Sequence, residues 1–215
     1  IEKMTGWLQT MIHPDNEISY FNDASIGIAR PPKDLIQEVQ NLFGFTYKLR
    51  KINYLRDSGF FQYTSKNLRL FFDVGDIGAS YIPGHGHADT LSVEASLFGR
   101  RLLVNTGTSL YEEGDRRIHE RGTSAHNTLQ IRDKNSSDVW KSFRVGKRAK
   151  IQKFNINDEG KFLHIDAAHD GYKTFYRNLI HERVIKLSDS ELTILDRVQN
   201  YSGLHTVRYH LHPKI

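Results

Sequence analysis

Two histidines and an aspartate stand at alternate positions in the stretch GHGHADT: His85, His87 and Asp89. Alternate residues of an extended chain point to one face, so we expect these three side chains to leave the same face together. Gly84 and Gly86 beside the histidines let the backbone approach a ligand, a use of glycine that an ordinary strand disfavours. Because imidazole carries protons and binds metals, the pattern indicates a functional site rather than two structural histidines.

A second group of reactive side chains lies between the strand expected to end near Thr106 and the strand expected to begin near Asn127. These twenty or so residues read as irregular loop, which is longer than a compact domain usually keeps without a purpose. A solvated surface loop is the alternative explanation. The side chains are Tyr111, Glu112, Glu113, Asp115, Arg116, Arg117, His119, Glu120, Arg121 and His126.

The elements that must position these groups follow from hydrophobic spacing. Met4, Trp7, Leu8 and Met11 recur at helical spacing, and residues 33–43 repeat that pattern before a glycine stop at Gly44. From Tyr47 onward the period is two, in many short segments separated by Gly, Asn, Asp and Ser. The chain is therefore predicted to be mainly β, an antiparallel β-sandwich with a short helical N-terminal segment, divided into residues 1–46 and residues 47–215.

Composition limits the classes of function. The 215 residues contain no cysteine, so any metal must take nitrogen or oxygen ligands. A net charge of +5 suits an anionic partner, but the basic residues are dispersed and no nucleic-acid-binding motif is present. Neither a membrane span nor a signal peptide is expected. Strand-like alternation continues into the final HLHPKI, so we expect a piece of a longer protein whose sandwich continues past the last residue.

GHGHADTLSVEASLFGRRLLVNTGT followed by RGTSAHNTLQI resembles the β-sandwich portion of the heparinase II/III-like polysaccharide lyases. The earlier stretch WLQTMIHPDNEISYFNDASIGIA is similar to the last helices and exit loop of the α/α toroid that precedes this sandwich in the family. The resemblance implies that residues 1–46 are the remnant and linker of such a toroid, and that the upstream toroid domain of the same polypeptide is a partner.

The resemblance also implies a chemistry: β-elimination in uronic-acid-containing acidic polysaccharide, with this chain supplying the sandwich side of the active site. Elimination needs a neutralised carboxylate, a base for the C5 proton and an acid for the leaving oxygen. His85 and Tyr111 are the implied catalytic residues, and Arg116, Arg117 and Arg121 are candidates for binding substrate carboxylates or sulfates. The family's main catalytic residues lie upstream, so we expect this chain alone to be inactive and its parent to be a periplasmic or secreted enzyme.

For a cofactor, the resemblance implies a structural divalent metal, zinc first, held by His87, Asn105 and His126. The family has aspartate where this chain has Asn105. A neutral amide oxygen is a poorer zinc ligand than a carboxylate, and Asp89 is an alternative donor.

Two other functions stay open. A non-catalytic carbohydrate-binding sandwich would use an aromatic platform, for which the candidates are Trp140, Tyr172, Phe175 and Tyr176. A role in surface-polysaccharide assembly would hold or trim polymer on a lyase-like fold. The identity of the polysaccharide is not encoded in any pattern of this sequence.

Overall fold

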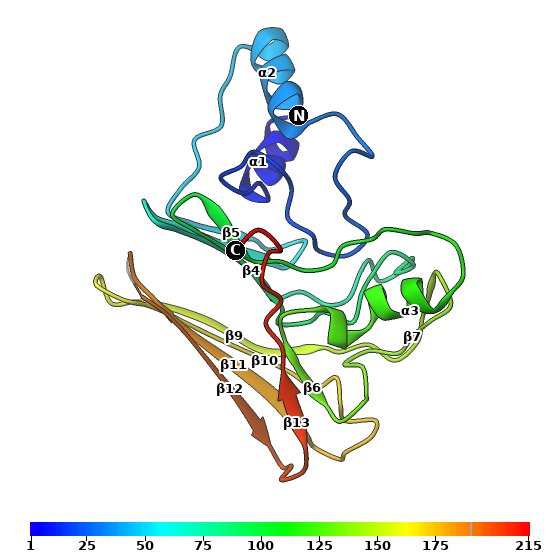
Figure 1. Ribbon diagram of the computed structural model, residues 1–215. Helices are drawn as coiled ribbons and strands as arrows, with labels where there is room; N and C mark the ends of the chain where they lie inside the picture. The colour runs from blue at the N-terminus through cyan, green and yellow to red at the C-terminus, as the bar shows by residue number, and fades with distance from the viewer. Residues whose placement is uncertain (190) are drawn as a thin grey trace.

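A computed structural model describes residues 1–189 and 191–215 as two antiparallel sheets packed face to face, with two helices projecting from one side (Figure 1). The first sheet runs in the order β1-β2-β3-β4-β5 and the second in the order β12-β11-β10-β9. The mainly β sandwich with a helical N-terminal segment is therefore confirmed. No helix among the described residues is long and apolar enough to cross a membrane.

The helices are α1 (Glu2–Thr10), α2 (Pro32–Phe43), α3 (Asp115–Arg121) and a 3₁₀ turn at Thr123–Ala125. The first sheet contains β1 (Ile52–Leu55), β2 (Phe60–Thr64), β3 (Leu68–Asp73), β4 (Val93–Leu97) and β5 (Arg100–Leu103). The second contains β9 (Ile151–Asp158), β10 (Leu163–His169), β11 (Ile180–Leu187) and β12 (Leu192–Gln199). Two further pairs are β6 (Leu129–Ile131) with β13 (His205–Val207), and β7 (Val139–Trp140) with β8 (Arg144–Val145).

The main core lies between the two sheets because alternate residues of each strand are apolar and face inward. On β3, Leu70 and Phe72 point into this core, and Ile165 of β10 and Ile185 of β11 meet them from the other sheet. Phe71 points to the opposite face of β3, where it packs against the N-terminal segment in a second, smaller cluster. The first sheet is therefore covered on both faces.

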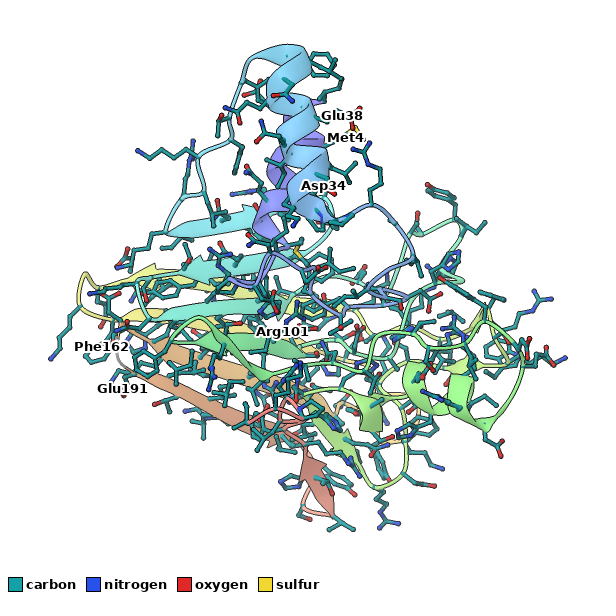
Figure 2. All side chains as sticks on the ribbon, turned by 45° about the horizontal axis from the view of Figure 1, so that its top comes forward. Met4, Asp34, Glu38, Arg101, Phe162 and Glu191 are labelled. Carbon is teal, nitrogen blue, oxygen red and sulfur yellow. The ribbon has the colours of Figure 1, made fainter. Side chains whose placement is uncertain are left out.

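The turn residues Asp57, Ser58 and Gly59 predict a hairpin between two short strands, and β1 and β2 form that hairpin. Its glycine is required by geometry. Gly59 has φ of +72°, and a Cβ atom on it would lie 2.1 Å from the Cα of Gly75. Helix α2 likewise ends as predicted, at Gly44 with φ of +69°, and begins with proline in its first turn. The predicted apolar stripe of α1 is only partly buried: Met4 is 74% exposed, whereas Met11, just past the end of the helix, is buried in the smaller cluster. The buried positions within the helix are Thr5, Gly6 and Thr10. Figure 2 shows Met4 on the helical projection together with Asp34 and Glu38.

Two expectations about the site region are wrong. Residues 84–92 form no strand, because β4 begins only at Val93 and Leu91 takes a positive φ of +63°. A period of two therefore does not govern His85, His87 and Asp89. The segment between Thr106 and Asn127 is also not wholly irregular, because it contains α3 and the 3₁₀ turn.

The segment joining α1 to α2 crosses the outer face of the first sheet and is fixed to it by buried polar contacts. His13 lies 2.8 Å from the Glu94 carboxylate and 2.6 Å from the Ser96 hydroxyl. Arg101, labelled in Figure 2, donates from Nε to Asp15 at 2.7 Å. These contacts hold the following residues, up to Asp23, against the sandwich.

Candidate functional site

Asp23 is the centre of the candidate site, although it lies 62 residues before His85 in the sequence. Its Oδ2 atom lies 2.7 Å from Nδ1 of His85, and its Oδ1 atom lies 2.8 Å from Nε2 of His87. The Thr108 hydroxyl donates to Oδ1 at 2.8 Å. Arg117 donates to both oxygens, at 2.8 Å from NH2 to Oδ2 and by a shorter contact from NH1 to Oδ1. One carboxylate thus gathers side chains from three separate parts of the chain.

Asp23 is ionised in this setting. Burial of its side chain, which is 6% exposed, favours the neutral form, but hydrogen bonds from His87, Arg117, Thr108 and His85 outweigh burial and hold the pKa of the carboxyl far below its ordinary value. An ionised carboxylate only accepts hydrogen bonds, so both histidines must present an N–H to it. His85 therefore carries its proton on Nδ1, and in the neutral ring Nε2 keeps a free lone pair.

Arg117 forms the floor beneath the exposed part of the site. Its guanidinium is fully buried, and it also donates to the main-chain oxygen of Ser142 at 3.0 and 3.2 Å. The centre of the guanidinium lies 5.3 Å from the ring centroid of Tyr111 and 5.3 Å from that of Phe143. Such cation–π geometry fixes the two rings over a charged group that is itself fixed by Asp23.

Three rings form the solvent-facing rim. Tyr111 and Phe143 are 46% and 45% exposed and lie stacked, with centroids 5.8 Å apart and planes 15° apart. The imidazole of His85 stands edge-on to both rings, at centroid distances of 6.3 Å and 5.6 Å, with its side chain 70% exposed. A proton-carrying imidazole, a phenol and an apolar ring face are thus accessible from solvent at one place. This arrangement can bind a sugar ring and transfer a proton to or from it.

The three arginines predicted to bind substrate occupy different positions. Arg117 and Arg121 are fully buried, whereas the side chain of Arg116 is 67% exposed and pairs with Glu120 at 3.2 Å. Arg121 donates to the main-chain oxygens of Gly86 and Lys141 at 3.0 and 3.1 Å. Direct contact of these arginines with substrate stays a prediction. In this structure Arg121 binds the loop that carries the histidines, at Gly86, and Arg117 binds Asp23.

Arg121 also brings buried positive charge to the site. Burial, then the nearby charge of Arg117, lowers the pKa of Arg121 to about 10, which still leaves it protonated at neutral pH. Its hydrogen bonds within the described residues go to main-chain carbonyls, and its Nε has no partner there. Two buried cations, Arg117 and Arg121, therefore stand beside the single carboxylate of Asp23, and the excess positive charge favours an anionic ligand.

The implied metal ligands are only partly brought together. The rings of His87 and His126 lie 5.4 Å apart, and Nδ1 of His87 and both nitrogens of His126 are buried without a hydrogen-bond partner among the described residues. Those orphaned nitrogens suit a metal. Asn105 does not complete the set, because its Oδ1 already accepts hydrogen bonds from the Ser92 hydroxyl at 2.9 Å and from the Asn127 N–H at 3.3 Å.

No cluster of three or more His, Asp or Glu side chains within residues 1–189 and 191–215 is arranged to hold a metal ion. Asp89 does not supply the missing ligand: it is buried on the wall of a separate cavity of about 690 Å³, which Asp73 also lines. The residues present therefore do not fit the family's metal as a set. We assign no chemistry to a metal here.

Asp23 and Phe143 belong to the site but were not predicted from the sequence. Asp23 is recognisable only as a turn former, and its distance along the chain gives no spacing signal that joins it to His85. Phe143 stands three residues after Trp140, and no sequence pattern there distinguishes which of the two aromatic residues reaches the site. Of the aromatic platform proposed for a binding module, Tyr172 is fully buried and donates its hydroxyl to the main-chain oxygen of Leu129, so it lies in a core.

Comparisons with known proteins identify the family and the fold of this chain. The family model described as heparinase II/III-like, C-terminal, matches residues 48–215. The fold is similar to the heparan sulfate lyase HepC from Pedobacter heparinus, with a TM-score of 0.74 and 18% identity over 98% of this chain and 34% of that one. A heparinase III structure gives a TM-score of 0.73 and 16% identity over 98% of this chain and 36% of that one.

A second heparinase III structure gives a TM-score of 0.72 and 21% identity over 94% of this chain and 32% of that one. This chain thus spans about a third of the length of each of these proteins. A search of curated proteins gave no match. Since the family model covers most of the chain, from Lys48 to its last residue, the chain belongs to the heparinase II/III-like C-terminal family.

Proposed function

We propose that this chain forms the sandwich side of the active site of a polysaccharide lyase that cleaves uronic-acid-containing polysaccharide by β-elimination. The observation that carries the proposal is the exposed imidazole of His85, which Asp23 holds by Nδ1 while Nε2 remains available beside the phenol of Tyr111. The proteins of similar fold are a heparan sulfate lyase and heparinases. Family membership supports the reaction class.

The proposed roles follow from the chemistry of the side chains. β-Elimination moves two protons, one from C5 of the uronate to a base and one from an acid to the leaving glycosidic oxygen. Nε2 of His85 accepts or donates one of these protons, and the phenol of Tyr111, whose ring centroid lies 6.3 Å from that of His85, takes part beside it. The stacked rings of Tyr111 and Phe143 give a sugar an apolar surface, and the buried arginines favour its negative charge.

This chain works as one domain of a longer enzyme. The partner of this half-site is a preceding domain of the same polypeptide, whose residues complete the reaction, and the parent enzyme is periplasmic or secreted. Family membership and the fraction of the related structures that this chain spans support these statements.

The test measures unsaturated product by its ultraviolet absorbance, using the complete polypeptide with a panel of uronate polymers. Replacing His85 by Ala is expected to lower kcat/KM by about 10²-fold to 10⁴-fold, the usual contribution of a positioned proton carrier. His164→Ala is the matched control, because His164 is a partly exposed histidine on β10 of the second sheet. Equal activity of the His85 variant and the control would contradict the proposal.

A non-catalytic carbohydrate-binding module is the second candidate, and the exposed, stacked rings of Tyr111 and Phe143 favour it. The two functions differ in how they respond to His85. A binding module loses affinity for acidic glycan when Phe143 is replaced by Ala and keeps most of it when His85 is replaced by Ala. If the parent protein binds polymer but forms no unsaturated product with any member of the panel, binding is the function.

A further inference from the structure

Asp23 lies outside every segment that sequence patterns mark as reactive, yet its carboxylate is bonded to four other residues of the site. Its two oxygens meet His85, His87, Thr108 and Arg117. We propose that Asp23 is the positioning residue of this half-site: it fixes the tautomer and orientation of His85 so that Nε2 faces the substrate. This inference rests on the proposed function, but its test does not depend on lyase activity.

The carboxylate of Asp23 is fixed from both sides. Before it in the sequence, the contacts of His13 with Glu94 and of Asp15 with Arg101 attach the segment to the first sheet. After it, the N–H of Thr108 donates to the main-chain oxygen of Ala24 at 3.0 Å. This close approach depends on Gly107, which has φ of +59° and whose Cβ atom, if present, would lie 2.4 Å from that same oxygen. Asp23 is thus a rigid acceptor.

Each carboxylate oxygen of Asp23 receives more than one donor. Oδ2 accepts from His85 and Arg117, and Oδ1 accepts from His87, Thr108 and Arg117. With every neighbour donating, both histidines are held in a single tautomer. His87 is buried and supports the loop, whereas His85 is exposed and its Nε2 accepts no hydrogen bond from the described part of the chain. The tautomer of His85 therefore decides whether its exposed Nε2 offers a ligand a lone pair or an N–H group.

An isosteric amide cannot replace this carboxylate. In Asp23→Asn one of the two oxygens becomes an NH₂ group, which then faces donors of Arg117 and of a histidine whichever way the amide is turned. Placing the NH₂ at the Oδ2 position breaks fewer bonds, because the Oδ1 position also serves Thr108. The imidazole of His85 would then accept at Nδ1 and carry its proton on Nε2, the wrong tautomer for a base. Amide substitution beside a catalytic histidine has this consequence in other enzymes.

The experiment measures how fast diethyl pyrocarbonate acylates His85 in the complete polypeptide near neutral pH, with tandem mass spectrometry separating His85 from the buried His87. The reagent attacks a nitrogen that has a free lone pair. In the wild type the accessible Nε2 of His85 should react readily. In Asp23→Asn the rate should fall roughly tenfold or more, in line with the loss of a charge-assisted hydrogen bond that selects the tautomer.

Asp15→Asn is the matched control. Asp15 lies on the same segment, and the hydrogen bonds that it accepts come from buried Arg101 and from the Glu17 N–H, not from His85. In Asp15→Asn the amide oxygen still accepts from Arg101 and His13 still contacts Glu94, so the segment stays attached and we expect the acylation rate of His85 to be unchanged. Equal rates in the wild type and Asp23→Asn would overturn the proposal, and so would an equal slowing in both variants, which would mean general loosening of the segment.

A second measurement needs no variant and so does not depend on how well Asp23→Asn folds. Nitrogen-15 NMR of the complete polypeptide, labelled at histidine only, reports which ring nitrogen carries the proton. The proposal requires Nδ1–H for neutral His85 in the wild type, and Nε2–H would overturn it. If instead the tautomer is as expected and the intact enzyme forms no unsaturated product, the positioning role stands and the proposed lyase function fails.

Discussion

Arg183 on β11 donates from NH1 to the main-chain oxygen of Asn127 at 2.6 Å, and this bond joins the second sheet to the corner of the chain that carries His126. The same guanidinium donates to the main-chain oxygen of Leu91 at 2.8 Å and binds Asp196 through Nε and NH2. Because Arg183 is fully buried, its charge is matched by the carboxylate and its remaining N–H groups by these carbonyls. The histidine corner is thus held by a residue of the opposite sheet.

Replacing Arg183 by Lys should destabilise the fold by roughly 2 to 4 kcal/mol, because an ammonium cannot reproduce the forked bonds to Asp196 while also reaching the carbonyls of Leu91 and Asn127. Chemical denaturation followed by circular dichroism measures the change. Arg197→Lys is the control: its side chain is 58% exposed and pairs with Glu182 at 3.5 Å, so it should cost less than about 0.5 kcal/mol. Similar losses for the two variants would contradict the role given to Arg183.

Stability should fall as the pH is lowered past the ordinary histidine value, because His169 and His181 are buried as neutral rings. Nε2 of His169 lies 3.0 Å from Nδ1 of His181, whose Nε2 lies 2.7 Å from Asp196. Burial, the largest cause, lowers the pKa of both imidazoles below the ordinary 6.5. The folded state binds these protons more weakly than the unfolded state, so the neutral rings' contribution is present above pH 6.5 and is lost below it.

This linkage has a measurable slope. The free energy of unfolding should fall by up to about 1.4 kcal/mol per pH unit for each such histidine. In His169→Asn, Oδ1 can still accept the Gly171 N–H that Nδ1 accepts now, and one titrating ring is removed, so the slope should be shallower. Identical slopes for the wild type and His169→Asn would show that His169 does not titrate with folding.

Asp73 should have the opposite pH dependence. Burial, and then the charge of Asp89, raise the pKa of Asp73 well above its ordinary value. A raised pKa in the folded state means that the contribution to stability is present below the unfolded value and is lost as the pH rises through the folded one. Asp73→Asn keeps the acceptor for the Gly75 N–H and cannot ionise. Its melting temperature relative to wild type should therefore rise between about pH 5 and about pH 8, and a constant difference would contradict this.

Removing divalent metal should leave the fold unchanged, since Asn105 uses its oxygen within the protein instead of offering it to a metal. Dialysis against EDTA is expected to change the melting temperature by less than about 1 °C, which corresponds to a change of a small fraction of a kcal/mol in the free energy of unfolding. Zinc added to Asn105→Asp should raise it, because the carboxylate supplies the charge that the amide lacks. A fall of several degrees in the wild type would mean that His87 and His126 hold a metal without Asn105.

Much of the fold could be predicted because local rules decide it. The alternation in β3 puts Leu70 and Phe72 in the core, and Gly59 marks a hairpin that few other residues could form. The α1 stripe was only partly right, because apolar spacing predicts a helix but not which neighbour covers each residue: Met11 is buried and Met4 is exposed.

The site was only partly predictable. The sequence marks His85, His87 and Tyr111 as reactive side chains near glycines or in a long connection, and the structure brings them together around Asp23 and Arg117. Their common partner, Asp23, was missed because a hydrogen bond between residues far apart along the chain has no local pattern. Arg117 was recognised as a charged side chain, but its burial against Asp23 arises only from tertiary packing.

The most direct measurement of the central claim is a structure of the complete polypeptide with a bound uronate oligosaccharide. The account predicts a sugar over the rings of Tyr111 and Phe143, with Nε2 of His85 within about 3 Å of C5 or of the leaving glycosidic oxygen, the reach of proton transfer. A sugar bound on another face, with Nε2 of His85 facing only water, would contradict it.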